Sequence, residues 1–108
     1  MKRIKYDSKY ALIESCNVLD DGGIIVYPTD TVYGFGCNAR NNVAIKKLNS
    51  IKGRGGPMSI LAPNVKTALG WMDISSQHKE MAQNIISNTN TVVVPAKKSL
   101  CSDLIKGN

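Results

Sequence analysis

The sequence predicts an α/β fold with a twisted mixed sheet and flanking helices, and three observations support that class. Short apolar runs alternate along the chain with longer segments of helical periodicity. The run GIIVY at 23–27 has no polar alternation, which favours a strand covered on both faces. Asn or Ser residues stand before the helical segments, where their side chains can cap the first turn.

Four segments are predicted as strands. Ile4 and Tyr6 alternate with lysines near the N-terminus, and the other three segments are apolar runs that end near Pro28, Pro63 and Pro95. The predicted strands are 2–6, 23–27, 58–61 and 91–94.

Capping signals and apolar spacing predict the helices. Ser8 can cap a helix over 9–20, with Leu12, Cys16 and Leu19 on its buried face. Asn41 or Asn42 can cap a second helix that ends at the glycines after Lys52. Its expected buried residues are Val43, Ile45, Leu48 and Ile51. Asn64 and Ser75 can cap helices that run to Trp71 and to about Ile86, and a last helical turn is predicted within 100–105.

Size and composition favour one domain over residues 1–108. The apolar runs are too short to span a bilayer, so the default expectation is a cytoplasmic protein without a membrane partner. Three widely spaced cysteines and the single His78 give no disulfide framework and no zinc motif, and we assign no metal ligand. The formal net charge of +6 favours anionic partners such as nucleotides or RNA, although solubility accounts for it equally well.

The segment VYPTDTVYGFG at 26–36 is the first candidate for chemistry. Thr29, Thr31 and Tyr33 alternate, so in an extended segment their hydroxyls would point the same way. With backbone N–H groups near Gly34 and Gly36 they would form a polar cradle after a strand, where ligands of α/β proteins bind. The alternative is an ordinary turn, because Pro, Asp, Thr and Gly are also common turn residues.

The second candidate is KGRGG at 52–56. Lys52 and Arg54 leave a helix on a glycine-rich segment and could converge on phosphate oxygens. The alternative is a helix end whose macrodipole favours positive charge and whose glycine is a cap. The segment is neither a Walker loop nor a dinucleotide-binding fingerprint.

Together the two segments resemble the threonylcarbamoyl-AMP synthase family, the YrdC-like domain. That family has a strand running into PT(D/E)TVYGLG, a helix, a KxR motif, and then a proline and an apolar strand. Here residues 28–34 match in full, Phe35 replaces the usual Leu, and Lys52 and Arg54 match KxR. The resemblance therefore implies a YrdC-like fold.

The resemblance implies an enzyme, a nucleotidyltransferase that condenses L-threonine, bicarbonate and ATP into threonylcarbamoyl-AMP for the modification of adenosine 37 in tRNA. Thr29, Thr31 and Tyr33 would bind substrate, and Lys52 and Arg54 would bind the nucleotide and act in catalysis. ATP would be a substrate and would bring Mg²⁺, with Asp30 only a guess at a protein ligand.

The sequence also departs from the family. A Pro-Gly-Pro-x-Thr stretch and a Ser-x-Asn motif that helps to hold ATP do not occur before the chain ends at Asn108. We therefore expect an incomplete C-terminal part of the domain and a chain that is a poor catalyst alone. The competing hypothesis is a non-catalytic module that binds nucleotide, tRNA or double-stranded RNA. A homodimer that completes the sheet is also considered.

Overall fold

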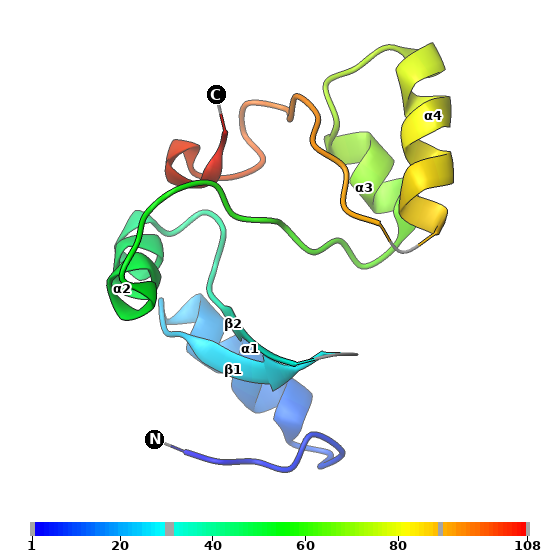
Figure 1. Ribbon diagram of the computed structural model, residues 1–108. Coiled ribbons are helices and arrows are strands. Elements are labelled where there is room, and N and C mark those ends of the chain that lie inside the picture. The colour runs from blue at the N-terminus through cyan, green and yellow to red at the C-terminus, as the bar shows by residue number, and fades with distance from the viewer. Residues whose placement is uncertain (1, 30–31, 89, 108) are drawn as a thin grey trace. The chain divides into compact units, whose positions relative to one another are not determined.

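The computed structural model describes residues 2–29, 32–88 and 90–107. The elements in chain order are α1 (Ala11–Asp20), β1 (Ile25–Pro28), β2 (Tyr33–Gly36), α2 (Asn42–Lys52), α3 (Val65–Trp71), α4 (Ser76–Ser87) and the 3₁₀ turn η1 (Asp103–Ile105) (Figure 1). They form two compact units, residues 1–57 with 102–108 and residues 58–101. The predicted α/β class is confirmed, while the assignment of 1–108 to one domain stays a prediction.

The sheet of the described residues is a hairpin of β1 and β2. The strands are antiparallel and pair Ile25 with Gly36, Tyr27 with Gly34 and Pro28 with Tyr33. The expected mixed sheet and a buried strand over 23–27 are therefore not seen in the described residues. Val26 is 49% exposed, so one face of β1 is open rather than covered.

The two glycines of β2 make room for the ring of Tyr27. A Cβ on Gly36 would lie 3.0 Å from Tyr27 Cε1, and one on Gly34 would lie 3.3 Å from Tyr27 Cζ. The ring thus crosses both glycine backbones on the face that also carries Ile25. An aromatic ring over a cross-strand glycine is a known way to stabilise a hairpin. Gly34 and Gly36 are therefore strand residues with a packing role, and the predicted cradle of N–H groups near them stays a prediction.

The second helix supplies the core of this unit. Asn41 accepts a hydrogen bond from Ala44 N at 3.0 Å, which confirms the predicted cap. Ala44, Ile45 and Leu48 are buried, and Ile105 of η1 is buried at 4% exposure. Ser102 N donates to Ala39 O at 2.8 Å and its hydroxyl hydrogen-bonds Asn42, so the C-terminal segment is fixed against the start of α2.

Two predicted buried faces differ from the structure. Val43 and Ile51 of α2 are 73% and 54% exposed, because the buried stripe of this helix runs through Ala44 instead. In α1, which lies against β1 (Figure 1), Leu12 is 75% exposed and Cys16 is also exposed. Helical periodicity identifies a stripe of residues, but the packing partner decides which stripe is covered.

The second unit consists of α3 and α4 with the segment that follows them. Asn64 and Ser75 cap these helices as predicted, accepting from Thr67 N at 2.8 Å and from His78 N at 3.3 Å. Asp73 N donates to Pro95 O at 2.8 Å, and Lys97 N donates to Trp71 O at 3.0 Å. These bonds flank a single bridge between Met72 and Ala96, and the buried side chains are Met72 and Ala82.

Three predicted strands are wrong. Within the described residues, the segments 2–6, 58–61 and 91–94 belong to no ladder, and Val93 is 95% exposed. Their apolar composition suits a strand, but a strand exists only where a partner satisfies its N–H and C=O groups. These segments meet no such partner within the described chain.

Candidate functional site

Thr29 closes the tip of the hairpin. Its backbone N donates to Val32 O at 3.1 Å, and its Oγ1 accepts from Val32 N at 3.1 Å. The hydroxyl also hydrogen-bonds the Val32 carbonyl. The hydroxyl thus has a local role as a turn residue, and its predicted role in binding substrate stays a prediction.

Thr29 and Tyr33 lie on opposite faces of the hairpin, which corrects the expectation that their side chains point the same way. The Thr29 methyl would be 3.6 Å from a Cβ on Gly34, on the face of Tyr27. Tyr33 pairs with Pro28 and shares the other face with Val26. The antiparallel strands place Thr29 and Tyr33 on either side of a chain reversal. Residues that alternate in the sequence across such a reversal therefore need not lie on the same face of the sheet. Thr31 and Asp30 lie outside the described residues.

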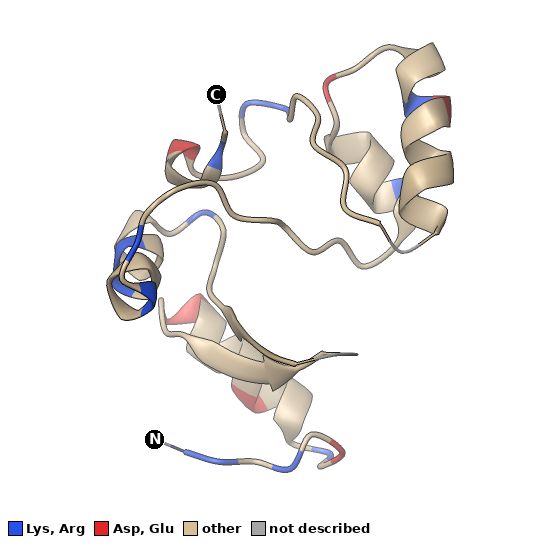
Figure 2. Ribbon diagram, viewed as in Figure 1, with Lys and Arg blue, Asp and Glu red and all other residues tan. Residues whose placement is uncertain are grey.

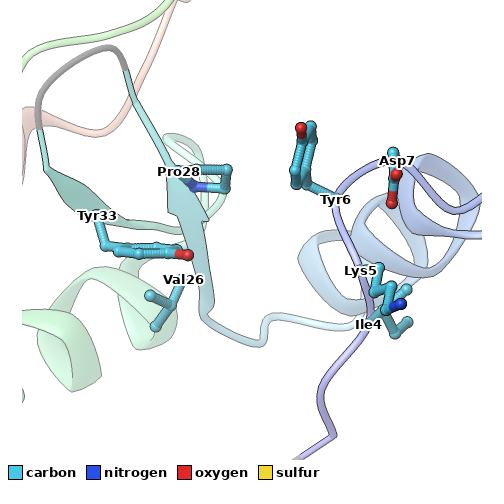
Figure 3. A pocket seen from close by; sticks show the side chains of 7 residues that line it. All are labelled: Ile4, Lys5, Tyr6, Asp7, Val26, Pro28 and Tyr33. Atoms are coloured by element: carbon cyan, nitrogen blue, oxygen red, sulfur yellow. The ribbon is translucent and has the colours of Figure 1, made fainter.

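Tyr33 lines a pocket on the open face of the hairpin. The pocket holds about 380 Å³ between the N-terminal segment 4–7 and the hairpin residues Val26, Pro28 and Tyr33 (Figure 3). The Tyr33 side chain is 73% exposed and Tyr6 is 80% exposed. No pattern in the sequence indicated that residues 4–7 would join a motif residue here.

Lys52 and Arg54 lie at the C-terminal end of α2, both exposed. Gly53 between them has φ of 74°, the left-handed cap conformation that glycine adopts most easily. Gly53 N donates to Ser50 O at 3.2 Å and Arg54 N donates to Asn49 O at 3.1 Å. This is the capped helix end that we gave as the alternative for KxR, and a capped end does not exclude anion binding by the two side chains.

The charge of Lys52 reaches Cys37, the residue after β2. Burial raises the pKa of the Cys37 thiol above its usual value, and the positive charge of Lys52 offsets part of that rise. Cys37 follows Gly36, which pairs with Ile25 at the base of the hairpin, whereas Thr29 is at the tip. Four residue steps, from Ile25 to Thr29, separate the two ends, which is about 13 Å.

Asn49, one turn before Lys52, was missed by the sequence analysis. Its side-chain Oδ1 is buried and has no hydrogen-bond partner among the described residues. Buried polar atoms are nearly always satisfied, so an unpaired acceptor calls for a donor from water or a ligand. An Asn on a helix gives no sequence signal for such a role, because its burial depends on tertiary packing.

The positive charge of the chain gathers in one stretch of sequence. Six of the 14 Lys and Arg residues lie in 31–72, where no Asp or Glu occurs. The rest of the chain therefore has eight basic and eight acidic residues, whose charges cancel. Figure 2 shows that the charged residues of α2 are all basic. The net charge of +6 therefore comes from the region that contains the KxR motif. This uneven distribution of charge can be read from the sequence alone.

The described residues contain neither a candidate metal centre nor a membrane-spanning helix. In residues 2–29, 32–88 and 90–107, no cluster of three or more His, Cys, Asp or Glu side chains could hold a metal ion. Within the same described parts, no helix has the length and apolar character needed to cross a membrane.

Comparison with known proteins gives a family match over most of the chain. The model of the Sua5/YciO/YrdC family, described as "Telomere recombination", matches residues 17–108. This range contains both candidate motifs, and it begins within α1.

Curated relatives agree with the match. A "Threonylcarbamoyl-AMP synthase" of Xylella fastidiosa (strain M12) is 31% identical over 90 residues, which cover 79% of this chain and 48% of the relative. A protein of the same name from Histophilus somni (strain 2336) is 32% identical over 91 residues, covering 80% and 50%. The chain thus spans about half the length of these relatives. No solved structure matches. On the family match and these relatives, the chain belongs to the Sua5/YciO/YrdC family.

Proposed function

We propose that this chain provides the nucleotide- and threonine-binding part of a threonylcarbamoyl-AMP synthase, which makes threonylcarbamoyl-AMP for the modification of adenosine 37 in tRNA. One observation carries the proposal. The complete PTDTVYG segment and the KxR motif one helix later both lie in the family match, and the relatives bear that enzyme's name.

In the proposed reaction, the amine of L-threonine forms a bond to the carbon of bicarbonate, a C–O bond of bicarbonate breaks and water leaves, which gives an N-carboxylated threonine. Its carbamate oxygen attacks the α-phosphorus of ATP, the bond from that phosphorus to the β-phosphate oxygen breaks, and pyrophosphate leaves. The barrier arises because an anion approaches a polyanion, so fixed positive charge supplies the largest help. Lys52 and Arg54 would hold the phosphate oxygens. Thr29, Thr31 and Tyr33 would bind substrate, and because Thr29 and Tyr33 lie on opposite faces of the hairpin, these two would contact different parts of it.

The charge of α2 supports the phosphate site at its end. This helix contains Lys46, Lys47 and Lys52 and no acidic residue, so its surface potential attracts a polyanion. Mg²⁺ would arrive bound to the ATP phosphates, because proteins usually hold this ion through substrate phosphates and only one or two carboxylates.

A second candidate function rests on the charge distribution. A basic stretch without acidic residues also suits a module that binds nucleotide or double-stranded RNA and does no chemistry. The cytoplasm would be the compartment for either function, since tRNA and ATP are both available there.

The deciding experiment incubates the purified chain with ATP, Mg²⁺, L-threonine and bicarbonate and measures threonylcarbamoyl-AMP by mass spectrometry. Product that depends on threonine and falls at least tenfold in Arg54→Ala supports the synthase. ATP binding that L-threonine strengthens, even with little product, is the result expected of an incomplete synthase, whereas binding of duplex RNA that neither ATP nor L-threonine affects identifies the binding module instead. Product formation that is unchanged in both Arg54→Ala and Lys52→Ala would contradict the proposed roles of these residues.

A further inference from the structure

The outer edge of β2 has no strand beside it in the unit formed by residues 1–57 and 102–108. Among the described residues of this unit, β1 pairs with one side of β2 and α1 packs against β1, so β2 keeps a free edge (Figure 1). A strand at the edge of a sheet presents a row of N–H and C=O groups with which another strand can pair.

The register identifies the groups that lie on this edge. Next to the turn, Thr29 N donates to Val32 O, so these two residues form a hydrogen-bonded pair. Hydrogen-bonded and non-hydrogen-bonded pairs alternate in an antiparallel ladder, and Tyr33 and Phe35 therefore each belong to a non-hydrogen-bonded pair with β1. The backbone N–H and C=O groups of Tyr33 and Phe35 point away from β1, into the free edge.

The two edges of the hairpin are protected differently. On β1, Pro28 stands at an outward position and has no N–H to offer, and proline is one of the residues that keep natural edges from pairing. The sequence of β2, YGFG, contains neither proline nor lysine. No Lys or Arg occurs between residues 11 and 39, so the basic residues behind the net charge of +6 lie outside the hairpin. The β2 edge therefore carries no charge that would repel a second strand.

This edge is complementary to a second copy of itself. When two β2 strands pair antiparallel about a twofold axis at Gly34, Tyr33 of each copy lies opposite Phe35 of the other. Each of these two pairs exchanges both of its N–H···O bonds, because both residues offer outward groups. The same register sets a Tyr33 side chain beside a Phe35 side chain on one face, and aromatic cross-strand pairs stabilise a sheet.

The side chains at this edge are available to such a partner. Tyr33 is 73% exposed and Phe35 is 49% exposed, on the open face that also carries Val26 and Pro28. The aromatic surface that one copy leaves in water would be covered by the same surface of the second copy, which gives the pairing a hydrophobic contribution in addition to its hydrogen bonds.

We propose that two copies of this chain pair through the outer edges of β2 and form one continuous antiparallel sheet with Gly34 at the twofold axis. A second copy fits better than a strongly charged partner, because the edge offers backbone groups and aromatic rings and no charge for such a partner to bind. This inference goes beyond the proposed function, which concerns ligands and gives the β2 edge no role, and it does not depend on that function.

Sedimentation equilibrium of the full chain over a wide range of concentration tests the dimer. Phe35→Lys should raise the dimer dissociation constant by about tenfold or more, because an aromatic pair is lost and a charge is placed in the edge. Val26→Lys is the matched control. Val26 pairs with Phe35 on the same face and is equally exposed, at 49%, but it lies on the strand away from the axis. Far-UV circular dichroism checks that both variants fold.

Amide hydrogen exchange followed by NMR tests the register in the unmodified chain. The N–H groups of Tyr33 and Phe35 should exchange slowly at concentrations where the dimer forms and rapidly where the chain is monomeric. The N–H of Gly34 faces β1, in a hydrogen-bonded pair with Tyr27, and should show the same protection at both concentrations.

Three results would overturn the proposal. A chain that stays monomeric over the whole range would leave the β2 edge to a different polypeptide. A dimer that Phe35→Lys and Val26→Lys weaken equally would be held by another surface. Exchange of Tyr33 and Phe35 that does not change with concentration would exclude edge pairing, and this measurement decides alone if Phe35→Lys fails to fold.

Discussion

Replacing Gly36 by alanine should strain the hairpin that carries the PTDTVYG segment. The new methyl would lie 3.0 Å from Tyr27 Cε1 and 3.4 Å from Ile25 Cγ1, and the first distance is shorter than side chains ordinarily tolerate. The φ of Gly36 is not among the positive values, so the cost arises from the ring and not from the backbone. Overpacking of this kind destabilises by about 1–3 kcal/mol. We expect this loss in urea unfolding followed by far-UV circular dichroism.

Two further variants separate this cause from a general effect of glycine. Gly70→Ala in α3 meets nothing within 4 Å and should raise stability by about 0.5–1 kcal/mol, since glycine is a poor helix former. Adding Tyr27→Leu to Gly36→Ala should remove most of the strain, which a double-mutant cycle would detect as coupling. A Gly36→Ala protein as stable as wild type, or an additive cycle, would refute the packing argument.

Three other predictions concern the α2 region. Asn41→Ala should lower the free energy of unfolding by about 1 kcal/mol, because the hydrogen bond to Ala44 N is lost; an unchanged urea midpoint would contradict this cap. Gly53→Ala should cost about 1–2 kcal/mol for its φ of 74°, while Gly55→Ala, with only an ordinary contact at 3.9 Å, should be close to neutral; equal costs would argue against the left-handed cap. The pKa of Cys37 is raised, so its alkylation by iodoacetamide should reach half-maximal rate above the usual thiol pH, and Lys52→Ala should move that midpoint higher still. A midpoint unaffected by Lys52→Ala would place the lysine away from the thiol.

Most features that depend on neighbouring residues could be predicted from the sequence, although the predicted Ser8 cap is wrong, since α1 begins at Ala11 and its first turn has no side-chain cap. The caps at Asn41, Asn64 and Ser75 were found because a capping side chain bonds an N–H only two or three residues away. The glycine stop after Lys52 is equally local. The family motifs were also found, since their spacing is a property of the sequence itself.

Features that depend on tertiary partners could not be predicted. The segments 58–61 and 91–94 have strand composition, yet a ladder requires a second chain segment that composition does not identify. The separation of Thr29 and Tyr33 onto opposite faces follows from the reversal of the chain between them, which alternation alone does not reveal. The packing of Tyr27 over Gly34 and Gly36 likewise joins two strands, and only the register shows it.

The claim that the end of α2 holds the phosphates of ATP is tested most directly by calorimetric titration with ATP at low salt. Removal of Arg54 or Lys52 should weaken binding by about tenfold to a hundredfold, as for loss of charge-assisted hydrogen bonds. Lys66→Ala is the control, because Lys66 is exposed on α3 and lies in the other unit. Binding should also weaken as salt rises. Equal losses in all three variants would mean that diffuse positive charge attracts ATP, and the phosphate site at Lys52 and Arg54 would be contradicted.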